Sequence, residues 1–205
     1  MHAGGQSTIT APKLRPPGAG IPRWQAVLAR RVLLPIYVAR HPWDTVPELL
    51  RTQARDLATE FERELKAGGA ERVQRRVLIP AMPGLEDDSR YWSLAMIPDH
   101  LRRVNARLVE VVRSLANDRP LPDGPNAIAE FKPDPGAGPG AIAPYLEATE
   151  ELARAIAQAP AGARASTGTV PHPWFGPLVL RQWVPFGAMH QGIHRRQWDQ
   201  IRARL

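Results

Sequence analysis

The stretch WVPFGAMHQGIHRRQ, residues 183–197, places His190 and His194 four positions apart on an expected C-terminal helix. Positions i and i+4 of a helix lie on one face, so two imidazoles at this spacing can point at one metal ion. An HxxxH pair is also common as two partly exposed helix histidines. A metal site therefore requires a third ligand and a pocket from elsewhere in the chain.

An apolar stripe runs along the same expected helix, which extends from about residue 177 to the C-terminus. Its members recur every three or four residues and are Val179, Trp183, Phe186, His190, His194, Gln197 and Ile201. Because residues at these spacings share one helix face, both histidines are expected to face the core. Pro185 lies inside the helix and removes one backbone hydrogen bond, so we expect a kink there.

Three further helices follow from hydrophobic periodicity and from helix boundary residues. We expect them over about 46–66, 90–115 and 139–158. The first is predicted to begin with a capping box at Thr45–Glu48 and to end at Gly68–Gly69. With the C-terminal helix, these make four amphipathic helices, and packing their apolar stripes together predicts an all-α four-helix bundle. No series of strands is expected.

The N-terminal part of the chain differs from the rest. Residues 1–22 are rich in Gly and Pro and predict a flexible tail. Residues 23–40, RWQAVLARRVLLPIYVAR, predict an extra helical segment that is kinked or ended near Pro35. We expect this segment to pack on the main body, although its basic and apolar character also suits a membrane surface. The predicted domains are therefore the tail, 1–22, and one helical bundle domain, 23–205.

The composition of the 205-residue chain excludes several kinds of site. There is no cysteine, which excludes disulfides, thiolate zinc sites and a cysteine nucleophile. The formal net charge is +7, and the arginines that carry it are spread along the chain rather than concentrated with aromatic residues. The longest apolar run, 32–39, is too short to span a bilayer. We expect a cytoplasmic protein with no membrane span and no specific nucleic-acid partner.

A third histidine, His100, lies within the stripe of the second expected bundle helix. The apolar members of that stripe are Ile97, Val104, Leu108, Val111 and Leu115. Three neutral imidazoles from two inward faces can form an open three-ligand site whose remaining positions take water or substrate. Imidazole suits Zn, Ni, Fe and Mn and does not decide between them. Core histidines that are satisfied by hydrogen bonds alone are the alternative.

The order of three segments resembles the DinB/YfiT-like family. These segments are SRYWSLAMIPDHLRRVN at 89–105, HPWFGPLVLRQW at 172–183 and HQGIHRRQ at 190–197. They are similar to that family's second-helix histidine, its HP-x-FGPL segment and its terminal HxxxH. The resemblance covers roughly residues 45–205 and implies a four-helix bundle whose metal ligands are His100, His190 and His194. Pro98 and Pro185 depart from the expected helices close to these ligands.

The resemblance also implies an activity. Members of the family are described as transferases or isomerases that depend on low-molecular-weight thiols such as mycothiol or bacillithiol. We therefore expect a divalent metal, a thiol cofactor, a small-molecule substrate and a homodimer. The alternatives are a metal-dependent hydrolase of the same fold and a non-catalytic helical-bundle binding protein. No residue is an obvious general base, so a metal-bound water or thiol would perform the acid–base chemistry.

Four further residues are expected near the three histidines. His172, in the loop before the last helix, could be a fourth ligand or could pack and cap that loop. Gln197 follows the HxxxH pair by one turn and could orient a ligand or a water. Trp183 is expected to wall a pocket or to pack in the core. Trp92, two helical turns before the expected ligand of the second helix, is predicted to close the mouth of the pocket.

Overall fold

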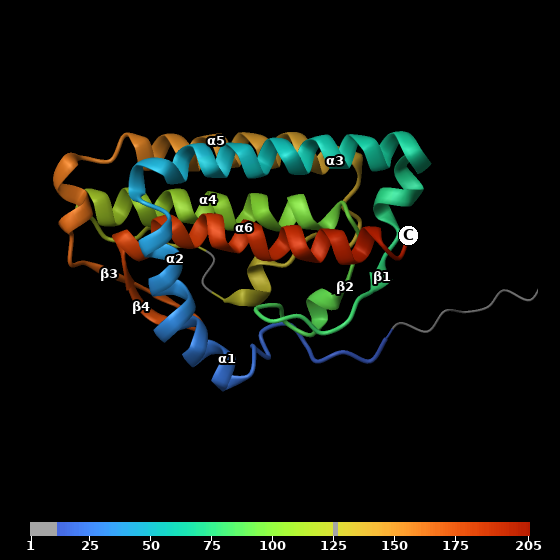
Figure 1. Ribbon diagram of the computed structural model, residues 1–205, viewed down its shortest axis with the longest axis horizontal. Coiled ribbons are helices and arrows are strands. Elements are labelled where there is room, and N and C mark those ends of the chain that lie inside the picture. Colours follow the sequence, from blue (N-terminus) through green and yellow to red (C-terminus); the bar gives the residue numbers. More distant parts are fainter. Residues whose placement is uncertain (1–11, 125–126) are drawn as a thin grey trace, which may run out of the picture.

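The computed structural model describes residues 12–124 and 127–205, and these residues are mostly helical, as the sequence predicts. The four longest helices are α3 (Val46–Gln74), α4 (Met96–Ala116), α5 (Ile142–Ala157) and α6 (Leu180–Arg202). They lie side by side (Figure 1). The connection between α4 and α5 returns along the length of these helices, so α4 and α5 run in the same direction, opposite to α3 and α6.

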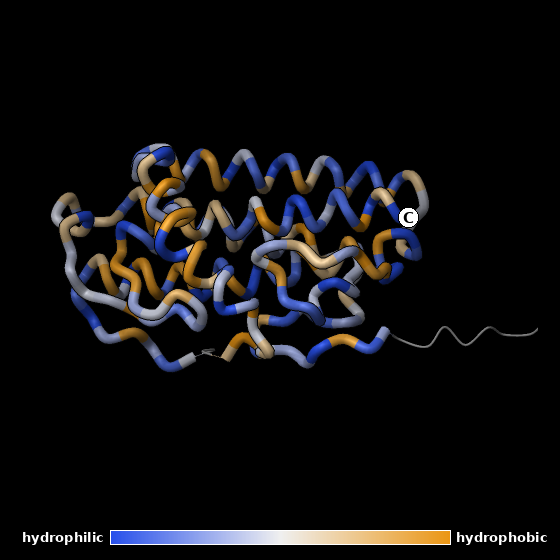
Figure 2. The backbone as a smooth tube through the Cα atoms, turned by 60° about the horizontal axis from the view of Figure 1, so that its bottom comes forward, coloured by the Kyte–Doolittle hydropathy of each residue, from blue (hydrophilic) through white to orange (hydrophobic). Residues whose placement is uncertain are grey.

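Each long helix buries one face because its hydrophobic positions recur with the helical period. Hydrophobic and hydrophilic residues follow one another within the turns of these helices (Figure 2). Side chains of the neighbouring helices pack closely on Gly187 of α6. A Cβ atom there would lie 3.3 Å from Leu108 Cδ1 of α4 and 3.6 Å from Leu152 Cδ2 of α5. The absence of a side chain at residue 187 therefore allows α6 to pack against both neighbours.

The first predicted bundle helix corresponds to α3, with two differences. Gly68 and Gly69 leave the helical conformation, as predicted, but a short helical stretch follows them to Gln74. The predicted capping box is absent. A 3-10 turn, Trp43–Thr45, leads into α3, and the hydroxyl of Thr45 donates to the Pro42 carbonyl at 2.7 Å instead of accepting from the first turn of α3.

The second predicted helix begins at Met96 rather than at about residue 90. The preceding residues form a 3-10 turn, Asp88–Arg90, and the short strand β2, Tyr91–Trp92, which pairs antiparallel with β1, Val77–Leu78. Pro98 is the third residue of α4. The first N–H groups of a helix have no intrahelical acceptor, so a proline there loses nothing and marks the start of the helix.

A β-hairpin precedes α6 where the sequence predicted a loop and, from about residue 177, the start of the last helix, so Val179 lies in a strand rather than on the predicted helical stripe. Strands β3, Thr169–His172, and β4, Gly176–Val179, pair antiparallel, with His172 opposite Gly176. Pro171 lies directly opposite Pro177. Proline has no N–H group, so two prolines can lie opposite each other in an antiparallel ladder only at a non-hydrogen-bonded pair. In this register the two prolines form such a pair. The prolines that obscured the strands therefore cost the hairpin no hydrogen bond.

The N-terminal segment is one helical stretch made of α1 (Arg23–Leu28), a π-helical turn (Ala29–Leu33) and α2 (Leu34–Arg40). Pro35 is the second residue of α2, and α2 begins directly after the π-helical turn. π-turns are a recognised way to accommodate an irregular hydrogen-bond ladder, so the helix continues past the proline instead of ending there.

Residues 1–11 of the predicted flexible tail lie outside the described residues. In the described part of that segment, the Gly20 N–H donates to Glu86 Oε1 at 2.9 Å. The remaining short elements are 3-10 turns at Ile128–Phe131, Pro139–Ala141 and Ala161–Ala165. Among the described residues, every helix is too short or too polar to cross a bilayer.

Candidate metal centre

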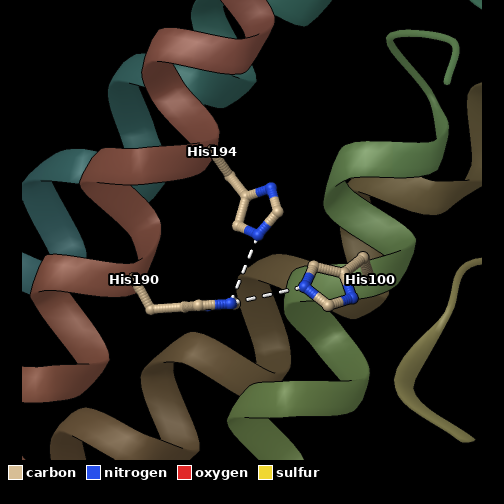
Figure 3. A group of neighbouring side chains, drawn as sticks. All are labelled: His100, His190 and His194. Atoms are coloured by element: carbon tan, nitrogen blue, oxygen red, sulfur yellow. Dashed lines mark hydrogen bonds between the residues drawn. The ribbon is translucent and has the colours of Figure 1, made fainter. Parts of the chain in front are cut away.

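The three predicted metal ligands lie together between two helices. His100 projects from α4, and His190 and His194 project from α6 toward it (Figure 3). The Nε2 atom of His190 lies 3.4 Å from Nε2 of His100 and 3.2 Å from Nε2 of His194. Two nitrogens bound to one ion at roughly 2.0–2.1 Å in tetrahedral geometry lie about 3.3 Å apart. The three imidazoles are therefore close enough to hold one metal ion.

A backbone carbonyl determines the tautomer of His100. Its Nδ1 lies 2.7 Å from the carbonyl oxygen of Phe131, in the connection between α4 and α5. A carbonyl only accepts, so Nδ1 must carry the proton. In the neutral ring, Nε2 then presents a lone pair toward the other two histidines.

A side-chain amide determines the tautomer of His194. Its Nδ1 lies 2.6 Å from Oε1 of Gln197, and Nε2 of that glutamine donates to the Ser89 carbonyl at 2.7 Å. The Ser89 carbonyl fixes which end of the amide is the donor, so the oxygen faces His194 and accepts from it. The Nε2 lone pair of His194 therefore also faces the shared point. Ligand histidines in metal sites commonly donate their second nitrogen in this way.

His190 differs from the other two because its Nδ1 is buried without a hydrogen-bond partner among the described residues. If its proton is on Nε2, it can satisfy one of the two facing lone pairs at a time. If its proton is on Nδ1, three lone pairs face one another, which is favourable only around a cation. In the metal-free ring cluster, Nδ1 of His190 is left unsatisfied with either tautomer, at a cost of about 1–3 kcal/mol.

All three rings favour the neutral form. Burial, reinforced by repulsion from His194, lowers the pKa of His100 and His190 well below 6.5. Burial lowers the pKa of His194 to about 4. Neutral imidazole is the form that binds metals, so the ligands need not lose protons near neutral pH.

Trp92 lies beside the histidines but not at a pocket mouth, so that prediction is wrong. Its ring is nearly parallel to that of His194 at a centroid distance of 5.7 Å and lies 5.1 Å from that of His100. It is 3% exposed. The prediction assumed that Trp92 lies on the helix of His100, whereas it belongs to β2. Trp92 covers the buried side of the cluster.

The opposite side of the cluster opens into a cavity of about 840 Å³. All three histidines line this cavity, together with Trp183 and His172. Most of the other lining side chains are apolar and come from the N-terminal segment, α4, the hairpin and α6. The cluster thus has one closed aromatic side and one side accessible to a ligand.

His172 and Trp183 support the hairpin beside this cavity. The N–H groups of Trp174 and Phe175 donate to Nδ1 of His172 at 3.1 and 3.3 Å, so this nitrogen caps the hairpin turn. His172 does not belong to the group whose ligand atoms converge. The indole N–H of Trp183 donates to the Val170 carbonyl at 3.3 Å. Of the two roles considered for His172, packing and capping is the one that its contacts show.

Comparison with known proteins gives one similarity. The chain is 22% identical over 130 residues, covering 56% of this chain and 79% of the other, to a Bacillus subtilis (strain 168) protein described as "Uncharacterized protein YuaE". No family model matches the chain. No solved structure matches it. The geometry of the site is therefore the main guide to function.

An ion cluster near the histidines was not predicted from the sequence. Nζ of Lys132 lies 2.6 Å from Glu86 Oε2, 2.8 Å from Asp88 Oδ1 and 2.9 Å from Ser89 Oγ. Glu86, Asp87 and Asp88 form an acidic run before α4, and Lys132 lies in the connection between α4 and α5. The sequence does contain a signal for this cluster. A buried acidic run needs a cation, and Lys132 is one of only three lysines in the chain.

Proposed function

We propose that this protein is a metal-dependent enzyme of the DinB/YfiT-like type, built on a four-helix bundle of α3, α4, α5 and α6. In this proposal it transfers a low-molecular-weight thiol to a small electrophilic substrate. The observation that carries the proposal is the convergence of three Nε2 atoms, two of them with their lone pairs fixed toward one point. The order of the three sequence segments supports it further.

His100, His190 and His194 would hold the metal, with positions left for a ligand on the cavity side. A divalent ion held there would lower the pKa of a bound thiol or water and so supply a nucleophile near neutral pH. The Phe131 carbonyl and Gln197 hold two of the rings in the orientation this requires. Trp92 excludes water from the opposite side of the rings.

The environment of the cavity favours a thiol over a water as the nucleophile. Hydrolysis benefits from a positioned general acid or base. Among the described residues, Glu86 is the only carboxylate that lines the cavity, and it is bound to Lys132 and to the Gly20 N–H. His172 uses Nδ1 to cap the hairpin turn. A bound thiolate needs no further proton acceptor for attack, so the chemistry of these residues supports thiol transfer.

Metal analysis tests the centre. Wild-type protein should retain roughly one divalent ion per chain after dialysis, and His190→Ala should retain none. The matched control is His172→Asn, which changes a histidine of the same cavity outside the converging group and should keep the metal. Stoichiometry is measured by elemental mass spectrometry, and folding by circular dichroism. A wild type without stoichiometric metal, equal in thermal stability to His190→Ala, would contradict the proposal.

The thiol is tested separately on cobalt-substituted protein. Millimolar bacillithiol or mycothiol should change the visible cobalt spectrum, since coordination by a thiolate adds a sulfur-to-metal transition. Methionine at the same concentration is the control because it has no ionisable sulfur. A spectrum that responds to neither compound would exclude direct thiol binding while leaving the metal centre intact. The proposed homodimer is tested by the molar mass in solution.

A further inference from the structure

The N-terminal segment, Arg23–Arg40, carries an unusual concentration of exposed apolar surface. Apart from Leu78, the large hydrophobic side chains that the described residues expose all lie on it: Trp24, Val27, Leu28, Val32, Leu33 and Ile36. Exposed apolar side chains that cluster on one element indicate a binding surface. The question is which molecule covers them.

The segment is anchored to the body along one edge. Leu34 is 1% exposed and belongs to the main core, and Ala29 and Tyr37 pack against that core. The segment passes from α6 toward the hairpin of β3 and β4 (Figure 1). It is therefore fixed in place and forms one wall of the cavity.

The exposed side chains of the segment fall into two groups. Trp24, Leu28, Leu33 and Ile36 line the cavity, whereas Val27 and Val32 do not. On the other walls, the lining includes apolar side chains from α4, the hairpin and α6, such as Leu108, Phe175 and Phe186, and it also includes the three histidines. The volume of about 840 Å³ lies in the range typical of sites for small molecules.

We propose that the cavity binds a small molecule with an elongated apolar body, which lies against Trp24, Leu28 and Ile36 and directs its reactive group toward the three histidines. The inference deepens the proposed function, because it assigns the apolar body to the electrophilic substrate. The placement of the reactive group at the three histidines rests on that proposed function. A polar low-molecular-weight thiol would leave most of the apolar walls uncovered. A protein partner or a membrane would cover Val27 and Val32 as well.

The binding test uses N-phenyl-1-naphthylamine, a neutral apolar dye whose fluorescence rises in apolar surroundings. Wild-type protein should bind it saturably, and 1-hexanol, 1-octanol and 1-decanol should displace it. Each added methylene group should improve displacement about two- to fourfold, as expected for burial of apolar surface. Displacement that does not depend on alcohol length would overturn the proposal.

Two adjacent residues provide a matched pair of variants. Leu28→Gln alters a cavity-lining side chain that is 42% exposed, and Val27→Gln alters a neighbour that is 59% exposed and outside the lining. Leu28→Gln should weaken dye binding about fivefold or more, and Val27→Gln less than about twofold. Ile36→Gln is the second cavity variant, with the same expected loss. Equal weakening by Val27→Gln and Leu28→Gln would show that the outer surface binds the dye and would overturn the proposal.

The metal-free variant separates this inference from the proposed function. His190→Ala should bind the dye within about twofold of wild type, because the apolar walls remain. If wild type proves to carry no metal but binds the dye with the expected variant pattern, the apolar site stands and the metalloenzyme proposal fails. If wild type carries metal but does not bind the dye, the apolar-substrate inference alone is wrong.

Discussion

Two of the three candidate ligand rings are held by hydrogen bonds on the side away from the shared point. His100 donates to a backbone carbonyl and His194 to Gln197. A ring that is held at Nδ1 cannot rotate its Nε2 away from the other ligands without breaking that bond. At this scale, the outer partner matters as much as the ligand itself.

Gln197→Met should therefore weaken metal binding although it removes no ligand. Methionine has a similar size but cannot accept from His194 Nδ1 or donate to the Ser89 carbonyl. We expect metal affinity to fall about 10–100-fold, measured by competition with a chromogenic chelator. Gln200→Met is the control, because Gln200 lies one turn further along α6 and bonds only to Arg204. Equal affinities in the two variants would contradict the role of Gln197.

The buried histidines should make the metal-free protein sensitive to acid. Burial lowers the pKa of His172 and of His194 to about 4 in the folded chain, whereas unfolded histidine titrates near 6.5. Between these values the unfolded state binds more protons, so the free energy of unfolding is highest above pH 6.5 and falls as the pH drops toward 4. Urea unfolding at pH 7.5, 6.0 and 5.0 in the presence of a chelator measures this loss.

His172→Asn isolates one contribution to the acid sensitivity. The side-chain oxygen of the asparagine can still accept hydrogen bonds from the N–H groups of the hairpin turn, but asparagine does not titrate. The variant should lose less stability between pH 7.5 and 5.0 than wild type, by on the order of 1–2 kcal/mol. A wild type whose stability is the same at both pH values would contradict the burial of neutral histidines.

Sequence pattern predicted the ligands better than the residues that support them. His100, His190 and His194 fall on helical stripes, and a stripe is a local property that can be read from spacing. The structure brings them together as expected. Trp92 was misplaced because its position was extrapolated from a helix that begins only after it. Its contact with His194 joins residues about a hundred positions apart and has no local signature.

Helix α6 carries two of the candidate ligands and, at Gly187, a position with no space for a larger side chain. Gly187→Leu should destabilise the protein by about 1–3 kcal/mol, because a Cβ atom would already lie 3.3 Å from Leu108 and the rest of the side chain has no space. Gly192→Ala is the control on the same helix. A Cβ atom there would meet only Gln53 Nε2, at 4.0 Å, so we expect a gain of about 0.5–1 kcal/mol from helix propensity. Chemical denaturation measures the free energy of unfolding of both variants. A Gly187→Leu variant as stable as wild type would contradict the close approach.

Long elements were predictable and short ones were not. The four long helices follow from three- and four-residue hydrophobic spacing, which persists over many turns. The strands β1 and β2 have two residues each, too few to show an alternating pattern. Prolines suggested a loop in β3 and the start of a helix in β4, and only the pairing of one strand with the other shows that these prolines are compatible with a hairpin. Pairing is a tertiary property that spacing does not reveal.

Over the whole molecule, the cluster around Lys132 connects three segments that are distant in the sequence. Its ammonium binds Glu86 and Asp88, and Glu86 also accepts from Gly20. The cluster thus ties the N-terminal region, the segment before α4 and the connection that carries Phe131. A buried ion pair of this kind is costly to break, because the remaining charges lose their partner.

Lys132→Met should destabilise the protein by about 3 kcal/mol, because Glu86 is 3% exposed and would keep a buried charge without its cation. Arg164→Met is the control. It breaks a pair with Asp44 in which both side chains are more than half exposed, and it should cost less than about 1 kcal/mol. Thermal and chemical unfolding compare the two variants. A loss in Lys132→Met no larger than in Arg164→Met would contradict a buried structural role.

The arrangement of whole segments was the least predictable level. Composition identified Arg23–Arg40 as basic and apolar and predicted packing on the body in preference to a membrane surface, but not which part of the body it covers. The structure packs this segment on the body as a cavity wall. Which surface an amphipathic helix covers depends on the shape of the remaining fold, and a hydrophobic pattern does not contain that shape.

The bond between His100 and the Phe131 carbonyl has a consequence for how relatives of this chain can vary. Every amino acid offers the same carbonyl oxygen, so residue 131 can be exchanged for almost any other without losing the acceptor. The connection between α4 and α5 is therefore free to diverge in sequence as long as its backbone passes the same point. Two proteins could share this way of holding the ring and show no common residue at that position.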